Sequence, residues 1–276
     1  MSDFKPYQLY GIIGHPLGHS MSPMLHTTAF KALNIPAVLV PWSLPPEKLQ
    51  TFIDAFRLLG IKGACVTIPY KQSIIPYLDE VTDRVKAMGA ANLIYDRDGK
   101  ICGDNTDVLG FMAPLKENPP AADSKILLMG AGGAARAVVA GLQALGFKDI
   151  TVTDIVPELP EALVKTFGLK QIPWDKRHEA PATVVINATP MGMKGKFEGE
   201  TAYPAEWFAG RRGLAYDVVY TPFETRFQKE AKAAGWATVS GLKMFMAQAD
   251  AQFHTWTGQH LPDEAKQTVI DALSQA

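Results

Sequence analysis

Residues 127–142, LLMGAGGAARAVVAGL, limit the possible folds more than any other segment of this chain. A short apolar run ends at Gly130, and a helix of small residues follows. Gly130, Gly132 and Ala135 match the G-x-G-x-x-G/A pattern, in which the first glycine permits a tight turn, the second lets the backbone approach a pyrophosphate, and the third position keeps the helix close to the strand. The helix N-terminus adds N–H donors and a partial positive charge. We therefore predict a Rossmann-like dinucleotide-binding unit.

Apolar segments alternate with helical ones on both sides of this turn. After it, residues 125–130, 149–154, 182–188 and 213–220 are near-continuous apolar runs, which is typical of parallel strands covered on both faces. Before it, strands are expected at 10–14, 37–42 and 63–68, and a hairpin at 92–103 that turns at Asp98 and Gly99. A helix is expected from Ser22, its N-cap, and the segment 118–123, NPPAAD, is the best linker candidate. The sequence thus predicts an α/β protein with two domains.

Composition and charge exclude several classes of protein. The 276 residues carry a net charge of −1 and contain two cysteines, Cys65 and Cys102, both in apolar runs. We expect neither nucleic-acid nor membrane-surface binding, no disulfide framework and no metal site, with both thiols as inert core groups. Residues 1–11 lack the apolar core of a signal peptide, and the chain has no apolar run long enough to span a membrane. We expect a cytoplasmic protein.

Asp154 bears on the identity of the cofactor. It ends the strand after the glycine turn, near the position about 20 residues on where an acidic residue binds the ribose hydroxyls of NAD. A carboxylate there repels a 2′-phosphate, and no arginine occurs between Arg136 and Arg177. We expect NAD to be favoured, with NADP possible because distant lysines can fold back. The alternative is a tight turn that binds nothing, beside a solvated aspartate.

Polar groups before the turn each follow an expected strand or open an expected helix, where α/β proteins collect ligand-binding side chains. Taken alone, each has a simpler explanation: a serine or aspartate as a helix cap, a lysine at the surface. Ser20 and Ser22 offer donors for a carboxylate at a helix start, and a lysine just after a buried strand can act as a general acid or base. These candidates are Ser20, Ser22, Thr67, Lys71, Asn92 and the run Asp104–Asp107.

The motifs together resemble the shikimate dehydrogenase family, including its quinate/shikimate branch. The resemblance covers nearly the whole chain in order: IIGHPLGHSMSP, GACVTIPYK, GAAN, GDNTDVLGF, GAGGAARAV, VINATPMGM, YDVVYTPFET and GLKMFMAQADAQFHTWTG. It implies an N-terminal α/β substrate-binding and catalytic domain of residues 1–108 and 242–276, a Rossmann-like NAD(P)-binding domain of residues 109–241, and a cleft between them. It also implies a monomer or homodimer in aromatic amino acid biosynthesis.

The resemblance also implies a role for each candidate residue. Lys71 and Asp107 would be the catalytic pair, and Ser20 and Ser22 would bind the substrate carboxylate. The ring hydroxyls would contact Thr67, Asn92 and Gln248. The cofactor would contact Gly130, Ala131, Gly132, Gly133, Ala134, Asp154, Thr189, Tyr220 and Gly241.

The activity implied by the resemblance is interconversion of 3-dehydroshikimate and shikimate with a nicotinamide cofactor. Some positions depart from the family pattern: Cys65 stands where asparagine is common, and Leu93 stands where threonine follows Asn92. Asp154, Ile155 and Val156 replace the Asn-Arg-Ser/Thr of the biosynthetic NADP enzymes, which points to the branch that uses NAD. An NAD-dependent dehydrogenase acting mainly on quinate is therefore an alternative, and a non-catalytic NAD-binding sensor is a second one.

Overall fold

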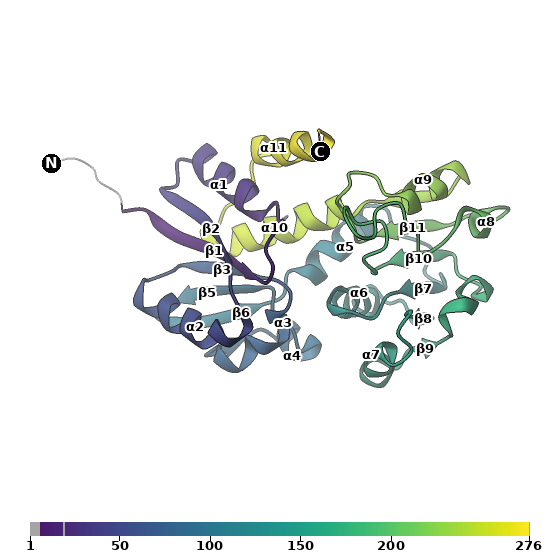
Figure 1. The fold of residues 1–276 in the computed structure, drawn as a ribbon, viewed down its shortest axis with the longest axis horizontal. Coiled ribbons are helices and arrows are strands. Elements are labelled where there is room, and N and C mark those ends of the chain that lie inside the picture. The colour runs from purple at the N-terminus through teal and green to yellow at the C-terminus, as the bar shows by residue number, and fades with distance from the viewer. Residues whose placement is uncertain (1–5, 19, 276) are drawn as a thin grey trace. The chain divides into compact units, whose positions relative to one another are not determined.

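The chain forms two compact units in the computed structural model, which describes residues 6–18 and 20–275 (Figure 1). Unit 1 contains the described residues up to Thr106 together with Gln248–Gln275, and unit 2 contains Asp107–Ala247. Residues 1–5 of the N-terminal segment that lacks signal-peptide features lie outside the described residues.

Unit 1 is built on a mixed six-stranded sheet with strand order β2-β1-β3-β5-β6-β4. β1 is parallel to β2 and β3, β5 is antiparallel to both β3 and β6, and β4 is parallel to β6. Its strands are β1 (Gln8–Gly14), β2 (Ala37–Ser43), β3 (Gly63–Val66), β4 (Glu80–Val81), β5 (Leu93–Arg97) and β6 (Lys100–Asp104). Its helices are α1 (Ser22–Ala32), η1 (Pro46–Lys48), α2 (Leu49–Leu58), α3 (Tyr70–Ser73), η2 (Ile75–Tyr77), α4 (Asp83–Met88) and α11 (Asp263–Ser274).

Both faces of this sheet are covered, because successive side chains of a strand point to opposite faces. Ile13, Val66 and Ile94 pack against Phe52 and Phe56 of α2, in a core that also includes side chains of α3 and α4. On the opposite face, Tyr10 and Leu93 of the sheet meet side chains of α1 and of the C-terminal part of helix α10 (Gly241–Thr257). These helix side chains are Phe30, Phe253 and Trp256.

The predicted hairpin turn is confirmed, whereas the predicted N-cap of the first helix is not. Asp98 and Gly99 both have positive φ, at 54° and 82°, as a two-residue hairpin turn requires. The expected N-cap at Ser22 is wrong: the cap residue is Met21, and Ser22 is the first helical residue. The physical reason is that Ser20 Oγ accepts the Ser22 N–H at 3.3 Å, so the serine two positions earlier satisfies this donor.

Unit 2 is a parallel six-stranded sheet with strand order β12-β11-β10-β7-β8-β9. This is the doubly wound order of dinucleotide-binding domains, in which the connections reverse direction between the first and fourth strands, here β7 and β10. Its strands are β7 (Ile126–Met129), β8 (Ile150–Thr153), β9 (Lys170–Gln171), β10 (Val184–Asn187), β11 (Leu214–Asp217) and β12 (Ala237–Val239). Its helices are α5 (Asp107–Glu117), α6 (Gly133–Ala144), α7 (Leu159–Phe167), η3 (Trp174–Glu179), α8 (Ala205–Phe208) and α9 (Arg226–Ala233).

Helices lie on both sides of the unit 2 sheet (Figure 1). On one face, Leu127 and Val185 share a core with Phe208 of α8 and Phe227 of α9. On the other face, Tyr216 stacks on Phe111 of α5, with ring centroids 4.8 Å apart. The prediction of a parallel, doubly covered sheet is confirmed. The linker predicted at 118–123 is wrong, because this segment joins α5 to β7 inside unit 2 and the division between units falls at Thr106.

The described part of the chain holds neither a membrane-crossing helix nor a metal-binding group. Across residues 6–18 and 20–275, each helix is too short or too polar to cross a bilayer. The same residues bring no three His, Cys, Asp or Glu side chains together as ligands for a metal ion.

Candidate functional site

The glycine turn lies at the carboxyl end of β7, at the point where the strand order of unit 2 reverses. Gly130 has φ of +100°, and a Cβ atom added there would lie 2.7 Å from the carbonyl carbon and oxygen of Ala188. A side chain is therefore excluded at Gly130 by conformation and by packing. At Gly132 and Gly133 an added Cβ would meet no atom within 4 Å, so the space in front of the turn is open. Open backbone at the first turn of α6 fits the pyrophosphate of a dinucleotide.

Asp154 braces this turn from the next strand. Its Oδ2 accepts a hydrogen bond from the Ala131 N–H at 2.7 Å, and its Oδ1 accepts one from the Val156 N–H at 2.9 Å. Each oxygen of the carboxylate therefore already has a backbone donor. Asp154 holds the second residue of the glycine turn against the end of β8.

A second polar cluster lies at the carboxyl ends of β10 and β11. The side chains of Asn187 and Asp217, which are paired in register, are joined by a hydrogen bond of 2.9 Å. Thr189 donates its hydroxyl to Asn187 Oδ1 at 2.6 Å. Burial raises the pKa of Asp217 to about 7, although hydrogen bonds from Thr225, the Val219 N–H and Asn187 favour its charged form.

The other two cofactor candidates of unit 2 lie beside these loops. Tyr220 stacks on Phe245 of α10, with ring centroids 4.8 Å apart. A Cβ atom at Gly241, the first residue of α10, would lie 2.3 Å from the Val218 carbonyl oxygen. Only glycine permits this approach, which seats the start of α10 on the loop after β11.

In unit 1 the structure brings Asn92 and Gln248 together. Asn92 Nδ2 donates to Thr106 Oγ1 at 3.0 Å and to Gln248 Oε1 at 3.3 Å, and Asn92 Oδ1 accepts the Thr106 N–H at 2.7 Å. Gln252, one turn after Gln248, donates to the Asn92 carbonyl oxygen and accepts from the Cys65 thiol at 3.1 Å. Cys65 is thus buried as expected, but it takes part in a polar network. We call these five residues the amide cluster.

Thr67 and Lys71 are held at the end of β3 by backbone bonds. The Thr67 N–H donates to the Ile13 carbonyl at 2.9 Å, and the Ala91 N–H donates to the Lys71 carbonyl at 2.7 Å. The second bond joins the backbone of Lys71 to Ala91, the residue that precedes Asn92 of the amide cluster. Ser20 and Ser22, after β1, lie at the start of α1 within one hydrogen bond of each other.

The run Asp104–Asp107 divides between the two units. Arg84 of α4 binds Asp104 through two hydrogen bonds of 3.0 and 2.5 Å. Burial raises the pKa of Asp104, but the bonds from Arg84, Thr82 and a backbone N–H outweigh it and hold this pKa below its usual value. Asp107 is the first residue of α5 in unit 2, where it is nearly buried.

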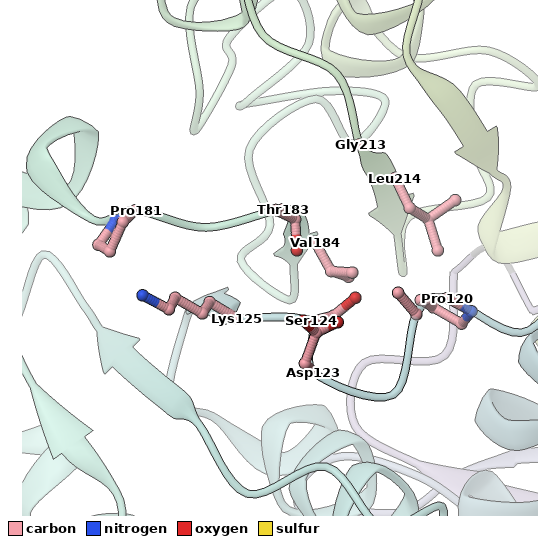
Figure 2. Close-up of a pocket in the computed structure, with 10 residues that line it drawn as sticks. Pro120, Asp123, Ser124, Lys125, Pro181, Thr183, Val184, Gly213 and Leu214 are labelled. Atoms are coloured by element: carbon pink, nitrogen blue, oxygen red, sulfur yellow. The ribbon is translucent and has the colours of Figure 1, made fainter.

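A separate pocket of about 480 Å³ opens at the amino ends of the unit 2 strands, opposite the end where the glycine turn lies. Figure 2 shows Lys125, Thr183 and Gly213 around it, at the amino ends of β7, β10 and β11. Ligands of doubly wound sheets bind outside the carboxyl ends of the strands. This pocket is therefore not part of the dinucleotide site.

Three residues of these clusters were not predicted from the sequence. They are Gln252, Asn187 and Asp217. Gln252 follows Gln248 by one helical turn, so the helical period could have found it. Asn187 and Asp217 both end apolar strands of a parallel sheet, which is the signal used to select Asp154.

Comparison with known proteins identifies the family. A model of the shikimate dehydrogenase substrate binding domain matches residues 12–94. A curated shikimate dehydrogenase (NADP(+)) of Pelobacter propionicus is 62% identical over 267 residues, which cover 96% of each chain. One of Oleidesulfovibrio alaskensis is 45% identical over 98% of this chain and 97% of its own. The crystal structure of the Thermus thermophilus shikimate 5-dehydrogenase with NADP(H) and shikimate has a TM-score of 0.86 at 32% identity, over 96% of this chain and 99% of that chain.

The expectation that NAD is favoured is wrong. Three curated relatives, at 62%, 45% and 42% identity, are named as NADP(+) enzymes. The Asp154 carboxylate was expected to face the ribose. In the structure its oxygens accept the Ala131 and Val156 N–H groups, so the residue supports the turn and its charge is partly compensated. With this correction, the fold, the motifs and the relatives agree, and the chain belongs to the shikimate dehydrogenase family.

Proposed function

We propose that this chain catalyses the NADP-dependent interconversion of 3-dehydroshikimate and shikimate. One observation carries the proposal: a Rossmann-type sheet with an open glycine turn occurs in a chain that is 62% identical, over nearly all its length, to a shikimate dehydrogenase (NADP(+)). The names of the relatives support shikimate over quinate as the substrate. We also place the enzyme in the cytoplasm, in the pathway to aromatic amino acids.

The cofactor would be held by unit 2. The backbone of Gly130–Ala134 and the first turn of α6 would bind the pyrophosphate, because these groups present N–H donors beside open space. Asp154 would keep the turn in place, and Thr189, Tyr220 and Gly241 would border the site. Bound NADPH supplies the hydride that reduces a ring ketone.

The substrate would be held by unit 1, with Asp107 of unit 2 completing the proton chemistry. Ser20 and Ser22 would bind the carboxylate, and Thr67, Asn92 and Gln248 would bind ring hydroxyls. Lys71 as an ammonium would donate a proton to the ketone oxygen and accept it in the reverse reaction. Asp107 would favour the charged form of Lys71 and accept a hydrogen bond from a hydroxyl.

A substrate and cofactor assay tests the function directly. The purified protein is offered shikimate and quinate, each with NADP+ and with NAD+, and the absorbance of the reduced cofactor is followed. We expect the highest kcat/KM for shikimate with NADP+. Higher kcat/KM for quinate would establish the alternative dehydrogenase. Cofactor binding without turnover of either substrate would favour a non-catalytic sensor.

Two alanine substitutions in the glycine turn test the cofactor site. Gly132→Ala adds a Cβ in open space, so the protein should fold as before while its dissociation constant for NADP+ rises about tenfold or more, since the pyrophosphate can no longer approach. Gly130→Ala adds a Cβ against Ala188 at positive φ, so its main effect should be a loss of about 2 kcal/mol or more in the free energy of unfolding. Fluorescence titration and thermal unfolding separate the two. Unchanged NADP+ affinity in Gly132→Ala would place the cofactor elsewhere.

A further inference from the structure

Asp217 is a buried carboxylate to which the proposed chemistry gives no role. It is the last residue of β11, and its side chain is fully buried. Oδ1 accepts hydrogen bonds from Asn187 Nδ2 at 2.9 Å and from the Val219 N–H at 3.0 Å. Oδ2 accepts the Thr225 hydroxyl at 2.5 Å. Donors from three segments therefore converge on one buried carboxyl group.

Asn187 extends this network into the loop after β10. Its Oδ1 accepts the backbone N–H and the hydroxyl of Thr189, at 3.1 and 2.6 Å. Its Nδ2, besides binding Asp217, donates to the Met191 carbonyl at 3.1 Å. The Met191 N–H in turn donates to the Thr189 hydroxyl at 3.1 Å. One amide thus closes the whole loop from 187 to 191, and Asp217 fixes the orientation of that amide.

The two loops held by Asp217 are the neighbours of the glycine turn and of α10. Ala188, in the first loop, is packed so closely on Gly130 that a Cβ would lie 2.7 Å from its carbonyl. Val218 and Val219, in the second loop, approach Gly241 equally closely. A shift of the first loop would move the residues packed on Gly130, and a shift of the second would move the start of α10 at Gly241. The position of these loops therefore depends on a group that the dinucleotide need not touch.

We propose that Asp217 and Asn187 form a buried positioning pair, which fixes the loops after β10 and β11 against the glycine turn and so sets the affinity of unit 2 for NADP. This inference rests on the proposed function, because it names the support of the same cofactor site. The donors around Asp217 are neutral, and burial raises its pKa. A buried carboxylate without a cation is costly, so a role in packing alone would be better served by an apolar residue.

Two substitutions of Asp217 and one matched control test the pair. Asp217→Ala removes the shared acceptor, so we expect the dissociation constant for NADP+ to rise about tenfold or more as the loops lose their fixed spacing. The KM for shikimate at saturating cofactor should stay within about twofold. Asp217→Asn can still accept from Asn187 and Val219 through Oδ1 and donate to Thr225 through Nδ2. It should therefore restore NADP+ affinity to within about threefold of the parent.

Tyr216→Phe is the control, because Tyr216 is the neighbouring buried residue of β11 and its hydroxyl binds Phe111 on the other face of the sheet. It should lower the unfolding temperature while leaving NADP+ affinity unchanged. Titration of the protein fluorescence with NADP+, steady-state kinetics and thermal unfolding are measured on the full chain for every variant.

The inference is overturned if folded Asp217→Ala binds NADP+ within about twofold of the parent, or if its NADP+ affinity and its KM for shikimate change by the same factor. If Asp217→Ala does not fold, Asn187→Ala decides, with the same tenfold rise expected and an unchanged affinity counting against the pair. Failure of the proposed function looks different: the parent protein itself would then fail to oxidise shikimate with NADP+.

Discussion

The two units each bury a carboxylate at the carboxyl end of a strand, and they do so in opposite ways. In unit 1, Asp104 ends β6 and is bound by the guanidinium of Arg84 through two hydrogen bonds, which hold its pKa below the usual value. In unit 2, Asp217 ends β11 and is bound by an amide, a hydroxyl and a backbone N–H, and burial raises its pKa to about 7. The same residue type therefore has a fixed charge in one unit and a conditional charge in the other.

The neighbours of each carboxylate give a reason for this difference in charge. Asp104 lies one residue before Asn105 and two before Thr106, whose backbone and side chain bind Asn92 in the amide cluster. A fixed ion pair therefore anchors this end of β6 next to the amide cluster. Asp217 lies in a unit proposed to bind a phosphorylated, anionic cofactor. A carboxyl group that carries only part of a charge near neutral pH opposes such a ligand less than a full charge does.

The largest expected effect comes from the proposed catalytic pair, Lys71 of unit 1 and Asp107 of unit 2. Lys71→Ala should lower kcat by roughly 10²–10⁴-fold, because general acid–base groups contribute about that much. Asp107→Ala should lower kcat by a similar factor if the chemistry depends equally on both units. Steady-state kinetics of shikimate oxidation at saturating NADP+ measure this. A near-parental kcat for either variant would remove that residue from the pair and assign the proton chemistry to one unit.

The next largest effect is the pH dependence of stability conferred by Asp217. Its folded pKa of about 7 lies above the ordinary aspartate pKa of 3.8, so the folded protein retains this proton where the unfolded chain has lost it. The free energy of unfolding should therefore fall as pH rises from about 4 to about 7 and then level off. Asp217→Asn cannot ionise. Relative to the parent, it should gain about 2–3 kcal/mol between about pH 5 and pH 8, measured by urea unfolding.

Asp104→Asn is the matched variant with the opposite sign. The pKa of Asp104 is lowered in the folded state, so its stabilisation is present above the unfolded pKa and is lost as pH falls. The free energy of unfolding of the parent should therefore exceed that of Asp104→Asn near neutral pH, and this difference should disappear in acid. Relative to Asp217→Asn, the free energy of unfolding of the parent should fall as the pH rises from acid to neutral. Parallel pH profiles for the two variants would contradict the contrast between the units.

The strand–turn–helix around Gly130, the parallel sheet of unit 2 and the Asp98–Gly99 hairpin were all predictable, because each depends on local patterns. The division between the units was not readable from composition. The Pro-rich segment at 118–123 was the best candidate for a linker between domains, but α5, the helix before it, already belongs to unit 2. Helix α10 runs without a break from Gly241 in unit 2 into unit 1, and helical periodicity carries no information on which unit a turn joins.

The contacts within the candidate site could not be predicted from the sequence either. Polar residues after strands could be selected one by one, but the partners of each depend on contacts between distant segments. The residue type at Asp154 suggested a ribose ligand, and only its bonds to Ala131 and Val156 showed a brace for the turn. Likewise, Cys65 was predicted to be an inert thiol, and its hydrogen bond to Gln252 could not be predicted because the two residues lie 187 positions apart in the sequence.

The smallest of these effects concerns two glutamines on one face of α10, Gln248 and Gln252. Gln248 accepts from Asn92 and from the Thr106 hydroxyl, whereas Gln252 binds Cys65 and the Asn92 carbonyl. If Gln248 contacts a ring hydroxyl, Gln248→Ala should raise the KM for shikimate about tenfold, since a lost hydrogen bond costs about 1–1.5 kcal/mol. Gln252→Ala should mainly lower the unfolding temperature, with KM within about threefold of the parent. Neither should change NADP+ affinity, in contrast to the Asp217 variants. Equal rises in KM for the two glutamine variants would show that Gln248 acts only by holding Asn92 in place.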